Sequence, residues 1–183
     1  YSDRVSRKLE DLGYNVKGHM INFSDFGVPQ RRKRYILVGS LVGCPEEYFV
    51  RIVENKEDFL TDKGLGEKVI LGEAISDLER GHGEVNSAEF KGFKEGVYGK
   101  VESPYQEFMR KDTDGNLPDS HRFANHRQKT IERFEYILEN CLRDRSIGNE
   151  VKVRFKLKKN TIIPLDRDKP CRTLTTLPDD YIH

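Results

Sequence analysis

Apolar residues recur at helical spacing in three stretches of this chain, at residues 2–12, 68–80 and 126–142. A three-and-four repeat places such residues on one buried face, so each stretch predicts a helix. The third stretch is the most regular, and Asn125 precedes it as a candidate N-terminal cap. Its apolar face is formed by Ile131, Phe134, Leu138 and Cys141.

Strand patterns occupy three other stretches. Residues 14–21 alternate loosely and residues 34–42 are apolar, aromatic and β-branched, so we expect two strands joined by a loop over residues 22–32. Residues 151–158 alternate strictly between apolar residues and cations, which predicts a half-buried strand with a basic open face. That face is either solvated or turned toward phosphate groups. The cations are Lys152, Arg154, Lys156 and Lys158.

The remaining segments suggest how the chain is divided into domains. One helix and two strands cannot enclose a hydrophobic core, so we expect residues 1–43 to be the last part of a larger α/β sheet. Residues 44–67 have an irregular composition with at most one short helix at residues 46–53, and we interpret them as a linker. Residues 68–183 then form a small mixed α+β domain, in which residues 81–119 are expected to be loops with short strands.

Composition limits the classes of function. The chain has 183 residues, of which 36% are hydrophobic and 34% are charged, and its net charge is +1. Contact with a nucleic acid must therefore come from local clusters of cations rather than from the overall charge. The three cysteines show no paired spacing and the histidines are scattered, which indicates a reducing compartment and predicts no metal site.

Targeting signals are not evident in the sequence. No stretch is apolar for long enough to cross a membrane, and no signal-peptide pattern begins the chain. We therefore expect a cytoplasmic, monomeric protein without a membrane partner. The chain starts at Tyr1 and stops at His183 without a closing element, so we also expect it to be part of a longer protein.

Four consecutive cations, Arg31 to Arg34, lie where a turn containing glycine and proline enters the second predicted strand. Because that strand is expected to be buried, the cations are held at fixed positions and can meet a phosphate or a base edge at little entropic cost. Side chains alternate along a strand, so we expect Arg31 and Lys33 to face solvent, away from Arg32 and Arg34.

The stretch Asp25 to Arg34, which contains these cations, resembles the DNA (cytosine-5)-methyltransferases of bacterial restriction–modification systems. Their QxRxR sequence, called motif VIII, is matched by Gln30, Arg32 and Arg34. Shorter similarities stand in the family's order, and the last two resemble the segment that closes its target-recognition domain. They lie at residues 12–14, 72–78, 125–126, 168–176 and 181–183.

The resemblance implies that a methyl group is transferred from S-adenosylmethionine to carbon 5 of cytosine in double-stranded DNA. In this family the cytosine is flipped out of the duplex, a cysteine thiolate attacks carbon 6, and charge develops on the ring. A motif VIII arginine stabilises that charge at the exocyclic oxygen, and this role falls to Arg34. Arg32 would position the pocket or a neighbouring phosphate, and Gln30 would hold the loop and contact the DNA backbone.

Other DNA contacts are suggested by the C-terminal similarity. The segment Thr173 to Thr175 resembles a family segment that contacts the backbone near the flipped base, while an ordinary strand is the alternative interpretation. The candidate DNA-binding residues are therefore Gln30, Thr173, Thr175 and the four cations of residues 151–158.

Three parts of the family's catalytic machinery are not found in this sequence. The family's nucleophile belongs to a Pro-Cys-Gln sequence before motif VIII, its acid to a Glu-Asn-Val sequence, and its cofactor site to a glycine-rich turn. Cys171 follows a proline, but Arg172 comes next and the pair lies after motif VIII, so we interpret Cys171 as a structural cysteine.

The resemblance thus predicts the tail of a Rossmann-like methyltransferase sheet followed by a target-recognition domain. Such a chain would belong to a DNA (cytosine-5)-methyltransferase and would be inactive alone, because the nucleophile and the S-adenosylmethionine site are missing from it. A non-catalytic DNA-binding module or degenerate methyltransferase is the first alternative. An unrelated α+β interaction domain, without salt-dependent affinity for DNA, is the second.

Overall fold

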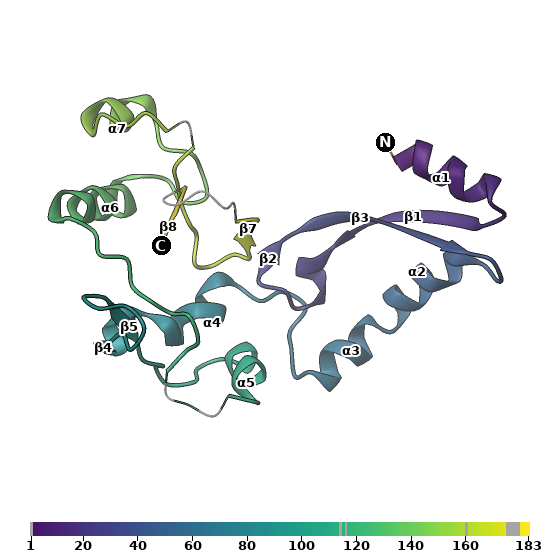
Figure 1. Ribbon diagram of the computed structural model, residues 1–183, viewed down its shortest axis with the longest axis horizontal. Helices are drawn as coiled ribbons and strands as arrows, with labels where there is room; N and C mark the ends of the chain where they lie inside the picture. The colour runs from purple at the N-terminus through teal and green to yellow at the C-terminus, as the bar shows by residue number, and fades with distance from the viewer. Residues whose placement is uncertain (1, 114, 116, 160, 175–179) are drawn as a thin grey trace.

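The computed structural model describes residues 2–113, 115, 117–159, 161–174 and 180–183, which form two lobes in succession along the chain (Figure 1). The first lobe contains α1 (Ser2–Asp11), β1 (Asn15–Asn22), the 3-10 helix η1 (Phe23–Phe26), β3 (Lys33–Ser40), α2 (Pro45–Glu54) and α3 (Lys56–Asp62). The second contains α4 (Leu71–Ile75), η2 (Ser76–Leu78), η3 (Arg80–His82), β4 (Glu84–Asn86), β5 (Lys94–Gly96), α5 (Pro104–Arg110), α6 (Gln128–Asn140), α7 (Asn149–Arg154), β6 (Ile163–Pro164), β7 (Cys171–Arg172) and β8 (Tyr181–Ile182). The short strand β2 (Gln30–Arg31) lies between the lobes.

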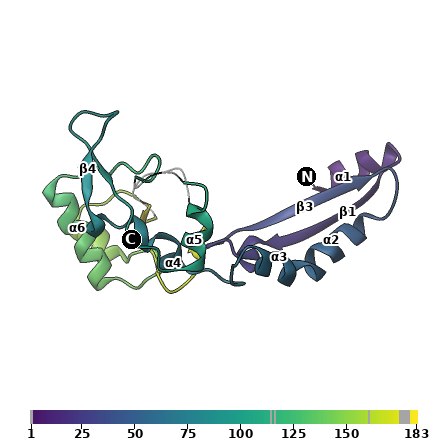
Figure 2. The same ribbon diagram turned by 90° about the horizontal axis from the view of Figure 1, so that it is seen from below.

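The first lobe is built on the antiparallel hairpin of β1 and β3, whose register runs from Asn15 opposite Ser40 to Asn22 opposite Lys33. This confirms the predicted helix, strand and strand of the N-terminal segment, with the helix ending before Gly13. Figure 2 shows the hairpin extending away from the second lobe, with α1 on one side and α2 and α3 along the other. The hairpin therefore has helices on both of its faces.

Most of the segment at residues 44–67 is helical, so the prediction of an irregular segment with one short helix is wrong in its secondary structure. Helix α2 includes the short helix expected at residues 46–53, and α3 follows it at once. Pro45 at the start of α2 and two acidic residues in its first turn favour a helix at this place. The buried ring of Phe49 packs 4.6 Å from the ring of His19 on β1, and the linker thus covers the hairpin.

The second lobe has its core around α6, which confirms the most regular predicted helix. Ile137 is fully buried there, and other buried residues of the cluster come from segments near the end of the chain. The predicted cap is wrong, because the residue before the helix is Arg127 and it makes no side-chain capping bond. The buried members of the cluster are Ile137, Ile147, Val151, Ile162 and Ile182.

The basic strand predicted at residues 151–158 does not exist in the structure. Residues 149–154 form helix α7, and only Val151 among its residues is buried, while Val153 is 76% exposed. Ile147, Val151 and Phe155 also stand four residues apart, and this helical period buries more apolar surface against α6 than the alternation would. Lys152, Arg154, Lys156 and Lys158 therefore do not line one face of a strand.

Helix α5 was not predicted, although a signal was present in the sequence. Ser103 caps the helix through its hydroxyl, which accepts a hydrogen bond from the Gln106 amide at 3.1 Å, and Pro104 takes the first helical position. The side chain of Gln106 is 1% exposed and donates to the Ser76 hydroxyl at 2.7 Å. The expected helix at residues 68–80 is divided where this bond forms, into α4 and the 3-10 helix η2.

In outline the fold is mixed α/β, as expected, with small sheets. The described residues contain four two-stranded sheets, β1–β3, β2–β7, β4–β5 and β6–β8, of which the second and fourth are parallel. Among those residues, no helix combines the length and the apolar character that a membrane crossing requires.

Two glycines with positive φ, one near each end of the hairpin, offer a test of packing. At Gly27 (φ 74°) an added Cβ would lie 3.1 Å from Leu65 Cδ1, whereas at Gly13 (φ 87°) it would meet no atom within 4 Å. We expect Gly13→Ala to lower the free energy of unfolding by about 1 kcal/mol through backbone strain alone. Gly27→Ala should cost about 1 kcal/mol more, because it adds overpacking to the same strain.

Urea unfolding of both variants and the unsubstituted chain measures this difference. Equal losses for the two alanines would mean that the loop around Gly27 yields freely, contrary to its burial between Leu60 and Leu65.

Candidate functional site

The motif VIII stretch lies at the base of the hairpin, where the chain leaves η1 and enters β3. Gly27 ends η1 in the left-handed conformation, and its amide donates to the Glu67 carbonyl at 3.3 Å. Three residues further on, the Gln30 amide donates to the Val28 carbonyl at 2.7 Å, which forms a tight turn at Pro29. The glycine and proline of the motif thus turn the chain so that Gln30 and Arg31 form the separate strand β2.

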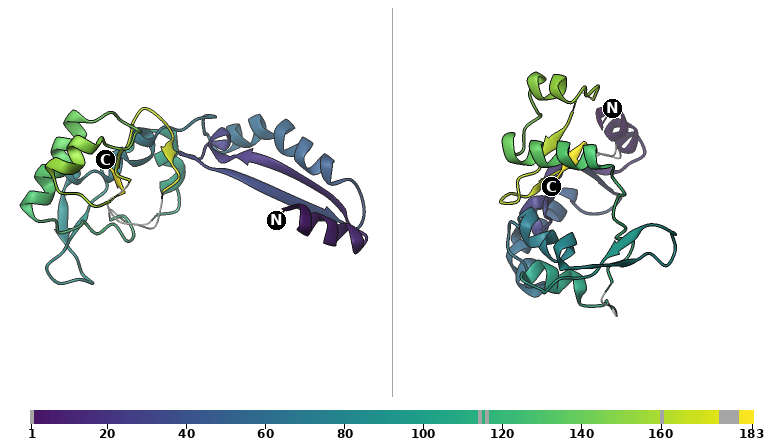
Figure 3. Two further views of the ribbon diagram at one scale, coloured as in Figure 1. Left: turned by 90° about the horizontal axis from the view of Figure 1, so that it is seen from above. Right: turned by 90° about the vertical axis from the view of Figure 1, so that its left-hand side faces the viewer.

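Strand β2 pairs in parallel with β7 from the far end of the chain. Gln30 is opposite Cys171 and Arg31 is opposite Arg172, and the Cys171 amide donates to the Pro29 carbonyl at 2.9 Å. Figures 1 and 3 show this yellow-green segment beside the start of the hairpin. The two most extended segments of the family resemblance, about 140 residues apart in sequence, are therefore neighbours in space.

A third segment of the resemblance joins the same region. The first amides of α4, at Leu71 and Gly72, donate to the carbonyls of Lys169 and Arg167, each at 2.9 Å. At Gly72 a Cβ would lie 3.2 Å from the Arg167 carbonyl oxygen, so a side chain there would crowd the backbone. The turn before β7 is thus held by α4 on one side and by β2 on the other.

Arg34 and Arg32 present their guanidinium groups to solvent. Arg34 is opposite Ile21 in the ladder, so the side chains of Arg34 and Ile21 leave the hairpin on the face that carries α2. The side chain of Lys33 leaves the hairpin on the opposite face. The Arg34 guanidinium donates to the Lys33 carbonyl at 2.7 Å, while the backbone of Arg32 is fixed by a hydrogen bond from the Phe23 amide. Within the described part of the chain, neither guanidinium forms an ion pair, so both keep donors for a ligand.

The alternation predicted that Arg31 faces solvent, but its side chain forms an ion pair within the fold. Its side chain is 43% exposed, but Nη2 donates to Asp144 Oδ2 at 2.5 Å across 113 positions of sequence. The Asp144 carbonyl also accepts a hydrogen bond from Arg172 Nη1 at 3.1 Å. No sequence signal marks Asp144, which follows α6 in a turn between two helices.

The other candidate residues at this junction are engaged in the fold. The Thr173 hydroxyl donates to the Arg31 carbonyl at 2.9 Å, and Tyr181 Oη donates to the Thr173 carbonyl at 3.2 Å. Thr175 lies outside the described residues. Cys171 is buried, and burial together with the nearby Asp144 charge raises the pKa of its thiol. A thiol in that environment stays protonated, which fits a structural cysteine better than a nucleophile.

A cavity of about 470 Å³ lies beside Gln30, between the motif VIII turn, α4 and α5. Its polar wall is already satisfied by internal contacts. Arg110 donates to the Gly99 carbonyl at 2.9 Å, pairs with buried Asp77 and stacks 4.0 Å from the Tyr98 ring. This cavity therefore offers mainly apolar surface next to the motif.

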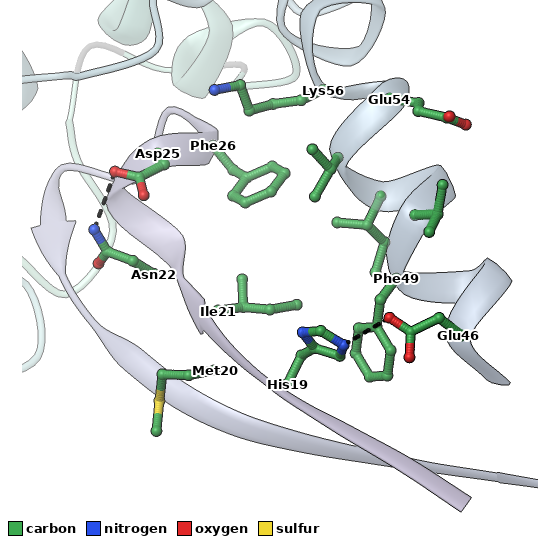
Figure 4. Close-up of a pocket in the computed structure, with 13 residues that line it drawn as sticks. His19, Met20, Ile21, Asn22, Asp25, Phe26, Glu46, Phe49, Glu54 and Lys56 are labelled. Carbon is green, nitrogen blue, oxygen red and sulfur yellow. Dashed lines mark hydrogen bonds and ion pairs between the residues drawn. The ribbon is translucent and has the colours of Figure 1, made fainter.

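A second cavity, of about 580 Å³, lies between β1 and α2 (Figure 4). Figure 4 shows Ile21, Phe26 and Phe49 pointing into it and Met20 pointing away. His19 contacts Glu46 at 3.1 Å at its edge, and the same carboxylate pairs with Lys17, which holds the pKa of Glu46 below its usual range. Asp25 and Phe26 line this cavity, but the QxRxR residues Gln30, Arg32 and Arg34 do not, so it is separate from the candidate site.

The connection that follows β3 lacks the glycine-rich turn typical of an adenosyl cofactor site. Strand β3 is followed by a helix, as in a cofactor-binding unit, but the connecting residues 41–44 contain a single glycine and no glycine-rich turn. In the part of the chain that the structure describes, no three residues of His, Cys, Asp or Glu gather at metal-binding distance.

Comparison with known proteins assigns the family. The model of C-5 cytosine-specific DNA methylases matches residues 2–183. Type II methyltransferase M.Bpa9945I of Bacillus paralicheniformis is 30% identical over 188 residues, which cover 90% of this chain and 37% of that protein. Type II methyltransferase M.NlaIV of Neisseria lactamica is 42% identical over 61 residues, which cover 33% of this chain and 14% of the relative.

A third relative is type II methyltransferase M.MthTI of Methanothermobacter thermautotrophicus. It is 37% identical over 75 residues, which cover 41% of this chain and 19% of that relative. The chain thus spans less than two fifths of each of these relatives. No solved structure matches it. Because the family model covers the chain from Ser2 to His183, the chain belongs to the C-5 cytosine-specific DNA methylase family.

Proposed function

We propose that this chain is part of a DNA (cytosine-5)-methyltransferase, which transfers a methyl group to carbon 5 of cytosine in double-stranded DNA. The observation that carries the proposal is the pairing of β2 with β7, which places the motif VIII residues beside the second matching segment. A chance match of separate short motifs would not bring them together in the fold.

In this proposal the hairpin lobe is the tail of the Rossmann-like catalytic sheet. Helices α2 and α3 belong with it rather than to a linker, since Phe49 of α2 packs on β1. Residues from about 68 onward form the target-recognition domain, beginning with α4. The junction of β2 and β7 lies between the two parts and would face the DNA.

Arg34 is the proposed stabiliser of the charge that develops on the cytosine ring. Its guanidinium is exposed, offers several donors in a rigid fork and has no carboxylate partner among the described residues. Such a group can donate to the exocyclic oxygen as negative charge builds there. Arg32, held by its backbone to η1, would contact the pocket or an adjacent phosphate, and Gln30 the DNA backbone.

The methyl group would come from S-adenosylmethionine bound by the rest of the enzyme. The turn after β3 is not glycine-rich, and Cys171 is buried with a raised thiol pKa, so the chain alone should not transfer methyl groups. These two observations favour a second function for the isolated chain, which is to bind DNA without chemistry.

The exposed cations of the second lobe are the proposed phosphate contacts. Lys156 and Lys158 are exposed just after α7, and Arg154 stacks 4.1 Å from the Tyr136 ring. These cations thus present their positive charge at the C-terminal end of α7 and not along the strand predicted from the sequence. Lys152 lies on the same helix, α7. Thr173 would contact the DNA backbone only if DNA displaced the hydrogen bond from its hydroxyl to the Arg31 carbonyl.

Replacing Arg34 by alanine in the complete enzyme should lower kcat for methyl transfer about 10²–10³-fold, as expected for loss of a transition-state donor. DNA affinity should change little, because one of many cations is removed. Single-turnover transfer of labelled methyl groups, with a parallel DNA-binding titration, separates the two effects.

The matched control for Arg34→Ala is Lys33→Ala, which removes the neighbouring cation from the opposite face of the hairpin. Its kcat should stay within about twofold of the unsubstituted enzyme. Equal losses for the two variants, or a parallel loss of binding and turnover in Arg34→Ala, would contradict the assigned role.

The isolated chain should bind a short DNA duplex with an affinity that falls as salt rises. Replacing both Lys156 and Lys158 by alanine should reduce the slope of log K against log salt by about 1.8, because each phosphate contact contributes about 0.9. Filter binding across a salt series measures it, with Lys8→Ala on α1 as the control. No affinity at low salt would favour an interaction domain unrelated to DNA.

A further inference from the structure

Asp144 connects three segments that are far apart in sequence. Its carboxylate accepts from Arg31 of β2, its carbonyl accepts from Arg172 of β7, and its amide donates to the Pro164 carbonyl of β6 at 2.7 Å. The carboxylate is 13% exposed, so its pair with Arg31 is shielded more than an ordinary surface ion pair. One short turn after α6 thus meets both strands of the lobe junction.

The backbone conformation of Asp144 explains why this residue type suits the position. Its φ is 65°, in the left-handed region that only glycine, asparagine and aspartate adopt readily. Glycine would satisfy the backbone without a carboxylate, and glutamate would be strained there. Aspartate combines the required turn with a charge that reaches Arg31.

The position of Arg31 determines how its neighbours are presented. Gln30 and Arg32 flank it, and side chains alternate along an extended strand, so fixing Arg31 on one side directs these two to the other. The Arg31 backbone is fixed as well, by the Thr173 hydroxyl at its carbonyl and by the ladder to β7. The ion pair adds the side chain itself to these restraints.

We propose that Asp144 is a positioning residue for the proposed methyl transfer: by holding Arg31 it fixes strand β2, and with it Gln30 and Arg32. This inference rests on the proposed function for its catalytic consequence. Its structural part, the restraint of the junction by the Asp144 carboxylate, concerns the chain alone.

The structural part is tested by hydrogen exchange on the 183-residue chain. Asp144→Asn is the variant of choice, because asparagine also accepts a positive φ and differs mainly in charge. We expect the Cys171 amide, which donates to Pro29 across the junction, to exchange about tenfold faster, while amides in the middle of α6 are unchanged.

Asp62→Asn is the matched control, since the Asp62 carboxylate pairs with adjacent Lys63 on the surface and is 71% exposed. Unchanged exchange at Cys171 in Asp144→Asn would overturn the restraint. Faster exchange throughout the second lobe would overturn it too, since it would show that Asp144 serves the stability of the whole lobe.

The catalytic part is tested by a double-mutant cycle in the complete enzyme. We expect Asp144→Asn to lower kcat about tenfold with KM for DNA within about twofold, since a small misplacement affects the reacting geometry more than binding. Arg31→Gln should give the same loss. Because both residues act through one pair, the double variant should lose no more than either single variant.

The outcomes separate this inference from the proposed function. If the unsubstituted complete enzyme transfers no methyl group to DNA, the proposed function fails whatever Asp144 does to exchange. If it is active and Asp144→Asn keeps the full kcat, the positioning role is wrong. If the two single effects multiply in the double variant, Asp144 does not act through Arg31.

Discussion

The two-residue ladder between β2 and β7 is the contact on which the arrangement of the lobes depends. It closes a loop of about 140 residues, and the entropy cost of that closure must be met by what surrounds so short a pairing. The structure supplies four further contacts there: the ion pair of Arg31 with Asp144, the two hydroxyl bonds at Thr173, and the anchoring of the preceding turn by α4. Each restrains the backbone that the proposed site uses.

The four consecutive cations show how identical charges acquire different roles. Arg31 is in contact with a carboxylate from the other lobe, so its charge is used within the fold. Lys33 and Arg34 leave opposite faces of the hairpin, and Arg34 keeps its guanidinium free of carboxylates among the described residues. A free arginine at a rigid strand end suits a ligand that develops negative charge, and a paired one suits a structural junction.

The second lobe shows that its core depends on contacts between distant segments. Ile137 of α6 packs against residues of the α7 region and of the C-terminal strand β8, and β8 pairs with β6 in parallel. No single segment has enough apolar residues to form this core alone. Polar contacts also join the start of α5 to α4 and η2, where Ser103 donates to the Glu73 carbonyl at 2.7 Å and Gln106 donates to the Ser76 hydroxyl at 2.7 Å. Ser103 and Gln106 are buried and hydrogen-bonded, which gives a small domain a specific geometry.

Sequence reasoning found the features that depend on local order. The helix α1, the strands β1 and β3 and the helix α6 follow from periodicity. The QxRxR residues were singled out by their spacing and neighbours, and the roles assigned to them stay predictions. The family itself could be inferred from those residues and is confirmed by the comparison. The strand predicted at residues 151–158 is wrong, because alternation and a four-residue repeat coexist there and only packing against α6 selects the helix.

By itself, the sequence thus determined the local elements and the family, since these depend on residues within a few positions of one another. Only the tertiary structure decided that Arg31 pairs with Asp144, that Cys171 is buried beside Gln30, and that α2 and α3 cover the hairpin. The physical reason is that these contacts join residues as far as 142 positions apart, and no local pattern encodes which distant segments will meet.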